Sequence, residues 1–183
     1  MDRLLENQLI LRCKEGDSLA FGQLIKNYRK QLFTYLLRLS GNKDMAEDLL
    51  QDTLTKAWHG LPKYEEKNKF SSWLFSIAHN IAMDAYRKKK VREVVSTYDE
   101  IPERSLIINQ EHALEAEELK NTIVDSLSQI PEKLRSVFLM RQHSGMSFKE
   151  ISNSTGQPLN TVLSHMHYAT KKLRKILRDK NVI

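Results

Sequence analysis

The chain has 183 residues, of which 40% are hydrophobic and 28% are charged, with a formal net charge of +6 at pH 7 and only 6 Gly and 4 Pro. This balance provides enough apolar material for a packed core and excludes wholesale disorder, while the scarcity of Gly and Pro favours helices over strands. The lone Cys13 excludes an internal disulfide and a cysteine-based zinc site. We predict an all-α protein of one ordinary domain or two small ones.

Two further classes are excluded by the pattern of apolar residues. No stretch approaches membrane-spanning length, and the N-terminus lacks a basic leader followed by an apolar core. We therefore expect a cytoplasmic protein without membrane insertion. The positive net charge makes a polyanionic partner plausible, although basic charge alone is shared by many unrelated proteins.

The first part of the chain has helical periodicity. Apolar residues recur at three- and four-residue spacing from Leu4 to about Leu39. The sequence Glu15-Gly16-Asp17-Ser18 interrupts them like a C-cap glycine followed by an N-cap residue. This pattern predicts a short first helix and a longer second one, which Gly41-Asn42 ends.

The next helix is expected from Asp44 to about Trp58 and has two distinct faces. One face is expected to be buried and holds Ala46, Leu49, Leu50, Thr53 and Ala57. The other is acidic and polar and holds Glu47, Asp48, Gln51 and Asp52. Acids near a helix N-terminus complement the helix dipole, by about 0.3 to 1 kcal/mol each, whereas a sustained acidic face also suits a basic partner. The residues alone leave both interpretations open.

Residues 68–90, NKFSSWLFSIAHNIAMDAYRKKK, combine aromatic rings, an apolar stripe and a basic end. They follow a polar loop and predict a helix opened by Ser71 or Ser72. Its inward face is expected to hold Leu74, Ile77, Ala78, Ile81 and Ala85. Its outward face is expected to hold His79, Asn80, Met83, Asp84, Arg87 and Lys88.

An acidic stretch separates this segment from the C-terminal part of the chain. We place a linker at about residues 93–112, between an N-terminal domain of residues 1–92 and a C-terminal domain of residues 113–183. A turn is expected at Ile130-Pro131. The residues alone fit a solvated tether.

The C-terminal part carries a predicted helix-turn-helix. Ser147-Phe148-Lys149-Glu150 fits a capping box, residues 154–158 form a glycine-containing turn, and a long helix follows. A major-groove reader of this kind presents the start of its second helix to base edges, here Asn160, Thr161, Ser164 and His165. Phosphates or a partner would be met by Lys171, Lys172, Arg174 and Lys175. A helical hairpin in the core of an ordinary protein has the same local pattern, so DNA binding is an interpretation at this point.

Three motifs occur in the order typical of one family. They are AEDLLQDT-x-x-KAW, F-x-x-WL-x-x-IA-x-N-x-x-x-D-x-x-R and S-x-x-EIS-x-x-TG-x-P-x-x-TV-x-S. Together they resemble the sigma-70 family, specifically the small extracytoplasmic-function (ECF) sigma factors. The resemblance covers nearly the whole chain apart from the linker, and it implies that this acidic segment mimics nucleic acid inside the basic channels of polymerase.

That resemblance implies a transcription initiation subunit with no catalytic activity of its own, no cofactor and no metal. Its implied partners are core RNA polymerase, through the β′ clamp helices and the β flap, promoter DNA, and an anti-sigma factor that holds it inactive until a stress or envelope signal. By the same resemblance the polymerase-docking residues are Asp48, Leu49, Gln51, Asp52, Thr55 and Trp58. Those that melt and read the −10 element are Tyr64, Asn68, Phe70, Ser71, Trp73, His79, Asn80, Met83, Asp84, Arg87 and Lys88. The −35 element is read by Ser147, Lys149, Asn160, Thr161, Ser164, His165, Lys171 and Lys172.

The chemistry of these residue types suits the implied roles. Unstacked bases are captured by aromatic faces, at about 1 to 3 kcal/mol per base, and the candidate rings are Tyr64, Phe70, Trp73 and His79. Phe70, Trp73 and Phe75 are equally compatible with a place in the core. The recognition helix departs from the family because Leu163, His165, His167 and Thr170 stand where basic residues are common. The histidines His143, His165 and His167 lack an accompanying carboxylate or cysteine pattern, so no metal site is expected.

Two rival functions remain open. A stand-alone helix-turn-helix regulator would not need the acidic-polar helix. A nucleic-acid enzyme would need a nucleophile with its base or a clustered metal site, and no such spacing is found in the sequence.

Overall fold

The computed structural model describes residues 2–65, 69–95, 122–180 and 182. The regular structure of these residues is entirely helical, so the all-α prediction is confirmed. Residues 122–128 are helical, and the other elements are α1 (Arg3–Lys14), α2 (Ser18–Lys26), α3 (Arg29–Ser40), α4 (Lys43–Gly60), the 3₁₀ turn η1 (Leu61–Lys63), α5 (Phe70–Val95), α7 (Glu132–Ser144), α8 (Phe148–Thr155) and α9 (Leu159–Asp179). Asn68 and nearly all of the predicted linker, from residue 96 onward, lie outside the described residues.

Several predicted helix ends have the expected capping geometry. Gly41 follows α3 in the left-handed conformation, with φ 68°, which a side chain at Cβ would strain. Ser147 caps α8 in a complete capping box, in which Glu150 N–H donates to the Ser147 hydroxyl and Ser147 N–H donates to the Glu150 carboxylate. The helix-turn-helix of α8 and α9 is therefore confirmed.

The prediction of one long helix from Ser18 to about Leu39 is wrong. The chain breaks at Asn27 and Tyr28, so that α2 and α3 are separate helices. At the break Tyr28 N–H donates to the carbonyl of Ile25, 2.9 Å away, in a tight turn. The side chain of Tyr28 turns toward α1, where its hydroxyl donates to the carboxylate of Glu6. A contact with a residue 22 positions earlier thus accompanies the break, which local periodicity does not reveal.

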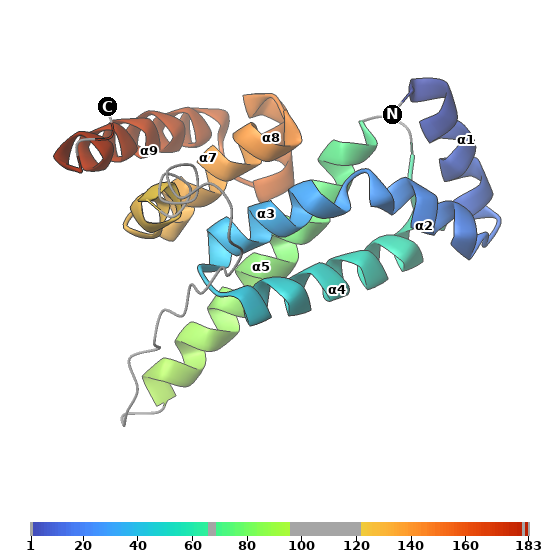
Figure 1. The fold of residues 1–183 in the computed structure, drawn as a ribbon, viewed down its shortest axis with the longest axis horizontal. Coiled ribbons are helices and arrows are strands. Elements are labelled where there is room, and N and C mark those ends of the chain that lie inside the picture. Colours follow the sequence, from blue (N-terminus) through green and yellow to red (C-terminus); the bar gives the residue numbers. More distant parts are fainter. Residues whose placement is uncertain (1, 66–68, 96–121, 181, 183) are drawn as a thin grey trace, which may run out of the picture.

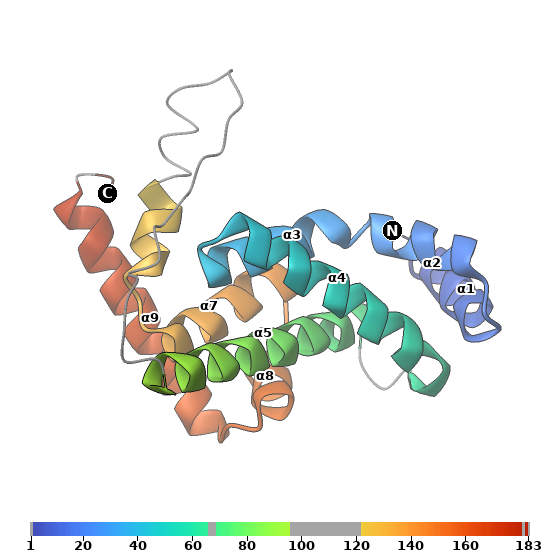
Figure 2. The ribbon, with the colours of Figure 1, turned by 90° about the horizontal axis from the view of Figure 1, so that it is seen from below.

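The helices are arranged around α5 (Figures 1 and 2). On one side α5 packs against α3 and α4, and on another it packs against α7 and α8. Helices α1 and α2 lie at one end of the molecule and α9 at the other, and the two termini lie far apart (Figure 1). The helix-turn-helix is thus packed onto the N-terminal helices.

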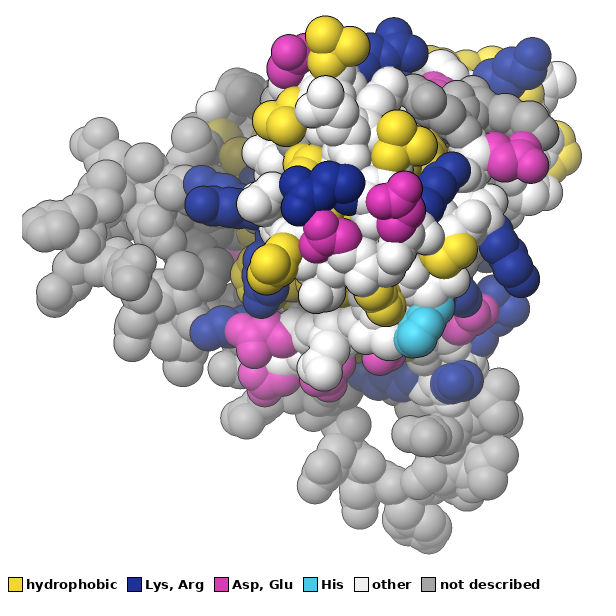
Figure 3. Space-filling view, turned by 90° about the vertical axis from the view of Figure 1, so that its right-hand side faces the viewer, with side chains coloured by type: hydrophobic (Ala, Val, Ile, Leu, Met, Phe, Trp, Pro, Cys, Tyr) yellow, Lys and Arg dark blue, Asp and Glu magenta, His cyan; other side chains and the backbone are white. Residues whose placement is uncertain are grey.

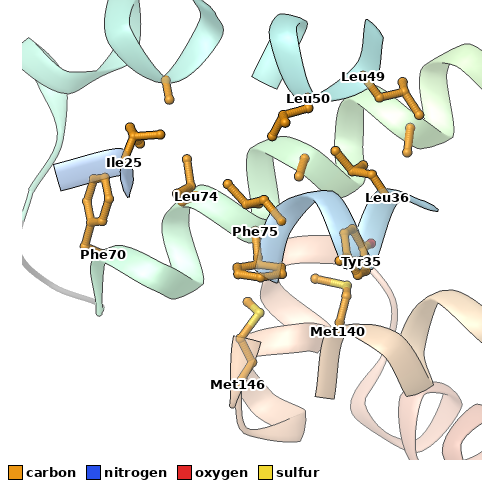
Figure 4. Packing of buried hydrophobic residues seen from close by; sticks show 14 of the residues in the cluster. Ile25, Tyr35, Leu36, Leu49, Leu50, Phe70, Leu74, Phe75, Met140 and Met146 are labelled. Carbon is orange, nitrogen blue, oxygen red and sulfur yellow. The ribbon is translucent and has the colours of Figure 1, made fainter. Parts of the chain in front are cut away.

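The two helical halves share one continuous core. Tyr35 of α3 and Phe75 of α5 are fully buried, their rings 5.5 Å apart edge to face, and they face Met140 and Met146 from the C-terminal half (Figure 4). Hydrogen bonds also join the halves: the hydroxyls of Ser76 and Ser154 are 2.6 Å apart, and the Ser72 hydroxyl donates to Glu150 over 3.3 Å. These contacts form a closed interface in which α3 and α5 meet α7 and α8.

The expected faces of α5 need correction. The fully buried stripe is Leu74, Phe75, Ala78, His79 and Ala82, while Ile77, Ile81 and Ala85 are only half-buried. His79, expected on the outward face, is 4% exposed. Because α5 is covered from two sides, it buries a different arc of residues from the single apolar stripe that periodicity predicts.

Two histidines beside Tyr35 make the fold sensitive to acid. The Tyr35 hydroxyl is 3.2 Å from Nδ1 of His79, and the His143 ring lies edge-on to Tyr35, with Nε2 3.4 Å from Arg38. Burial lowers the pKa of His79 to about 4, and burial together with Arg38 does the same for His143. Both side chains are therefore neutral in the folded protein near neutral pH.

We expect the free energy of unfolding to fall as the pH drops from about 6.5 toward 4, because the unfolded chain takes up protons that the folded chain excludes. The loss from His79 alone is at most about 1.4 kcal/mol per pH unit, with a smaller part from the half-exposed His143. Urea denaturation at neutral and mildly acidic pH measures it. His79→Asn should reduce the pH dependence, whereas His59→Asn, at an exposed position, should leave it unchanged; equal slopes for both variants would contradict this cause.

Candidate nucleic-acid interface

The two faces of α4 are separated as predicted. Ala46, Leu49, Leu50, Thr53 and Ala57 are all buried. Asp48, Gln51, Asp52 and Thr55 are exposed on the outer face. Leu49 is 4% exposed and belongs to the core, so it does not lie on this outer face, and its docking role stays a prediction. Trp58 is half-buried, with its ring 5.2 Å from that of Phe21 on α2.

The position of the acids within α4 favours a partner over the helix dipole. The dipole acts mainly on the first turn, and the only acid there is Asp44. Since α4 begins at Lys43, Asp48 and Asp52 lie one and two turns further along. Neither takes part in an ion pair with another described residue, whereas Glu47 pairs with Lys43 at 3.9 Å. Asp48 and Asp52 are thus two exposed acids without an ion pair among the described residues.

A groove borders this outer face, and sequence reasoning missed it. Its volume is about 820 Å³, with a basic edge from α2 and α3 and a polar edge from α4. The lining residues are Lys26, Arg29, Lys30, Phe33, Glu47, Leu50, Gln51, Leu54 and Thr55. The signal available in the sequence was the clustering of three basic residues within positions 26–30, but the break between α2 and α3 that places them along one edge was not predicted.

The rings proposed to stack on bases are largely internal. Tyr64 is 4% and Phe70 is 2% exposed, and both pack against Trp73, which is half-buried. Tyr64, Phe70 and His79 are therefore core side chains in this arrangement, and their contact with bases stays a prediction. Among the four candidate rings, Trp73 retains the most access to solvent.

The polar candidates on α5 are accessible. Asn80, Asp84, Arg87 and Lys88 are exposed, while Ser71 and Met83 are half-buried. Arg87 forms an ion pair with Asp84 at 2.8 Å, one turn away on the same helix. The exposed stripe from Asn80 to Lys88 thus starts with an amide and ends with positive charge, and its ion pair would have to open before Arg87 bonds a phosphate.

The recognition helix α9 presents a continuous outer stripe. Asn160 and Ser164 are exposed at its start, Thr161 and His165 are half-buried, and Lys171 and Lys172 are exposed further along. A basic surface continues past them to the end of the helix and includes Arg174, Lys175 and Arg178. Ser147 and Lys149 are exposed on the preceding helix. The helix therefore passes from polar, base-reading types to phosphate-binding types along one side.

His165 is less accessible than expected for a residue that contacts base edges. Its Nδ1 is buried without a hydrogen-bond partner, and burial, with Lys133 nearby, lowers its pKa. A neutral imidazole is thus favoured at this position. In the described part of the chain no three His, Cys, Asp or Glu side chains gather where a metal ion could be held.

A helix-turn-helix with a basic outer stripe, packed onto a second helical unit with an acidic-polar face, defines a helical DNA-binding protein. Residues 24–92 match Sigma-70 region 2, and residues 120–173 match Sigma-70, region 4. The chain belongs to the sigma-70 family of RNA polymerase sigma factors, in its ECF group. No helix among the described residues has the length and apolarity to span a membrane.

Curated relatives and solved structures agree with this placement. The ECF RNA polymerase sigma factor SigW of Bacillus subtilis is 32% identical over 180 residues, which cover 93% of this chain and 95% of the relative. SigL of Mycobacterium tuberculosis is 33% identical over 154 residues, covering 82% and 85%. The sigma factor RpoE of Bartonella quintana, solved in complex with the anti-sigma factor NepR, has a TM-score of 0.74 at 25% identity and covers 86% of this chain and 96% of that one.

Proposed function

We propose that this protein binds core RNA polymerase and directs promoter-specific initiation in the cytoplasm, without catalysis or a cofactor of its own. The observation that carries the proposal is the exposed, unpaired acidic face of α4 on the same chain as a helix-turn-helix. The first surface suits a protein partner, and the second suits duplex DNA. The names of the curated relatives support the polymerase as that partner.

Three surfaces divide the work. The outer face of α4, with Asp48, Gln51, Asp52 and Thr55 and the edge of Trp58, docks the β′ clamp helices. The exposed side of α5 and the connection before it, residues 64–69, open and read the −10 element. The start of α9, with Ser147 and Lys149 of the preceding helix and the basic residues Lys171 and Lys172, reads the −35 element. Residues 1–92 and 113–183 act as the two promoter-binding domains, and residues 93–112 link them.

Promoter recognition requires the closed interface to open. The −10 and −35 elements lie about 25 base pairs apart, which is about 85 Å along the duplex at about 3.4 Å per pair. A chain of 183 residues packed as one body has a radius of gyration of about 16 Å and hence a diameter of about 40 Å. The two halves therefore separate when they occupy both elements. An anti-sigma factor, as in the RpoE–NepR complex, restrains the protein by binding surfaces that polymerase needs.

The rival function is that of a helix-turn-helix regulator that acts without polymerase. Pull-down with core polymerase, followed by run-off transcription on genomic promoter fragments, separates the two. Association and promoter-dependent transcripts support the sigma function. Duplex binding by the free chain, with no association with core, would establish the regulator instead.

The exposed amide of Asn80 gives the sharpest test of the α5 surface. Asn80→Ala is expected to slow promoter opening about tenfold, because one base-edge contact is worth about 1 to 3 kcal/mol, while affinity for core polymerase stays unchanged. Permanganate reactivity of −10 thymines measures opening. Trp73→Ala should act in the same direction, but it also removes core packing. Gln142→Ala, at an exposed amide on α7, is the control; normal thymine reactivity with Asn80→Ala would remove Asn80 from the site.

A further inference from the structure

Helix α1 lies outside the segment matched to Sigma-70 region 2, which begins at residue 24. It nevertheless contacts the proposed −10 region, since it packs mainly on α2 and on η1. Leu4 and Leu11 of α1 are exposed, and the end of the molecule that holds α1 shows hydrophobic side chains interspersed with basic and acidic ones (Figure 3). The side of α1 that faces η1 is the side that contacts the proposed −10 region.

Two polar side chains of α1 reach aromatic residues near the −10 region. The carboxylate of Glu6 accepts a hydrogen bond from the half-buried hydroxyl of Tyr28. The ammonium group of Lys14 lies 5.8 Å from the centroid of the Tyr64 ring, within cation–π range. Burial, together with the Glu6 carboxylate, raises the pKa of Tyr28, so its hydroxyl remains a donor at neutral pH.

The tyrosines that α1 contacts belong to a ring cluster made of Tyr28, Tyr64, Phe70 and Trp73. The Phe70 ring is central: its centroid is 5.4 Å from that of Tyr28, 5.8 Å from Tyr64 and 5.5 Å from Trp73. Tyr64 and Trp73 are 4.9 Å apart. Trp73 also lies against Gly60, where an added Cβ would be 3.1 Å from the indole. These rings pack in near edge-on and tilted arrangements that fix their relative orientation.

The ring cluster joins the two ends of the connection between η1 and α5. Tyr64 directly follows η1, Phe70 is the first residue of α5, and Trp73 lies in the first turn of that helix. Contacts that hold these rings in place therefore also hold the start of α5 in place. Asn80 lies about three turns further along this helix. Helix α4, which carries the acidic face, packs mainly on α3, α5 and η1 rather than on α1.

We propose that α1 is a positioning element for promoter opening, in which Glu6 and Lys14 hold Tyr28 and Tyr64 and thereby orient the first turns of α5. The inference rests on the proposed function. Glu6, Lys14 and Tyr28 do not touch DNA in this role; they act through the ring cluster. Loosening α1 leaves the outer face of α4 in place, so it slows opening without weakening the docking of polymerase.

The test compares opening with docking in the full chain. Glu6→Leu with Lys14→Met is expected to slow opening of −10 thymines, followed by permanganate, about tenfold, with affinity for core polymerase within about twofold of wild type. The conservative pair Glu6→Gln with Lys14→Arg keeps an acceptor and a cation and should restore opening to within about twofold. Arg3→Met with Glu15→Leu removes one base and one acid at exposed positions of α1 and its C-cap and should open promoters normally.

The possible failures are distinguishable. If wild type with core polymerase opens no promoter, the proposed function fails first. If the Glu6→Leu, Lys14→Met variant opens promoters as fast as wild type does, the positioning role is overturned. Equal losses of docking and opening, with a lower melting temperature, would make α1 a stabilising helix only and would also overturn it. Should the double variant not fold, Tyr28→Phe removes only the hydroxyl donor and decides the question by the same measurements.

Discussion

Replacing Asp52 by arginine is expected to weaken binding to core polymerase by about a hundredfold or more, because like charges brought together at an interface cost several kcal/mol. Asp52 lies in the middle of α4, exposed and without an ion pair to any described residue. Reversal of its charge therefore changes the surface that meets the partner and leaves the core face of the helix intact. A binding titration of labelled protein with core polymerase measures the loss.

The matched control is Asp125→Arg, which makes the same reversal at an exposed acid in the C-terminal half. It should bind core polymerase like wild type, and both variants should show the same melting temperature. Because salt screens exposed charges, raising the salt concentration should reduce the difference in affinity for core polymerase between wild type and Asp52→Arg. Unchanged binding of Asp52→Arg at low salt would exclude the outer face of α4 as the docking surface.

The faces of α4 were predictable from sequence because only one of them is covered by other helices. Residues 46, 49, 50, 53 and 57 repeat at helical spacing and are all buried. The helix-turn-helix was predictable for a similar reason: its boundaries are set by local capping, through Ser147, Glu150 and the left-handed Gly156. Local hydrogen bonds and a single buried face depend only on neighbouring residues, so a short stretch of sequence is enough to predict them.

The faces of α5 were not predictable in this way. Helix α5 is covered by α3 and α4 from earlier in the chain and by α7 and α8 from later in it. In this setting His79, beside Tyr35 of α3, is buried, whereas Ile81 is half-buried. Ser72 and Ser76 were assigned to neither predicted face, and their hydroxyl groups form the hydrogen bonds to α8 and its C-terminal end. The periodicity of one helix carries no information on a second helix that packs across it.

The aromatic residues illustrate the same limit at the candidate site. Tyr64, Phe70 and Trp73 lie close together in the sequence. Aromatic residues are equally suited to stacking on bases and to packing on one another, so the sequence does not distinguish the two roles. Phe70 also meets the ring of Tyr28 edge-on. Tyr28 lies at the unpredicted break between α2 and α3, so this contact could not be predicted from local sequence.

A disulfide across the closed interface is expected to abolish transcription reversibly. The hydroxyls of Ser76 and Ser154 are 2.6 Å apart, so the two side chains point at each other, and cysteines at both positions should oxidise to a bond of about 2.05 Å. The native Cys13 is buried at 2% exposure and should not compete.

The oxidised Ser76→Cys, Ser154→Cys protein holds α5 against α8, so its halves cannot occupy elements about 85 Å apart. We expect run-off transcripts to fall at least about tenfold, and a reductant to restore them. Each single-cysteine variant, treated with the same oxidant, is the control and should remain active. Because the outer face of α4 stays exposed in the closed form, the locked protein should still bind core polymerase unless docking itself separates the halves. Full transcription by the oxidised double variant would mean that both promoter elements are read without opening this interface, and it would refute the separation that promoter geometry requires.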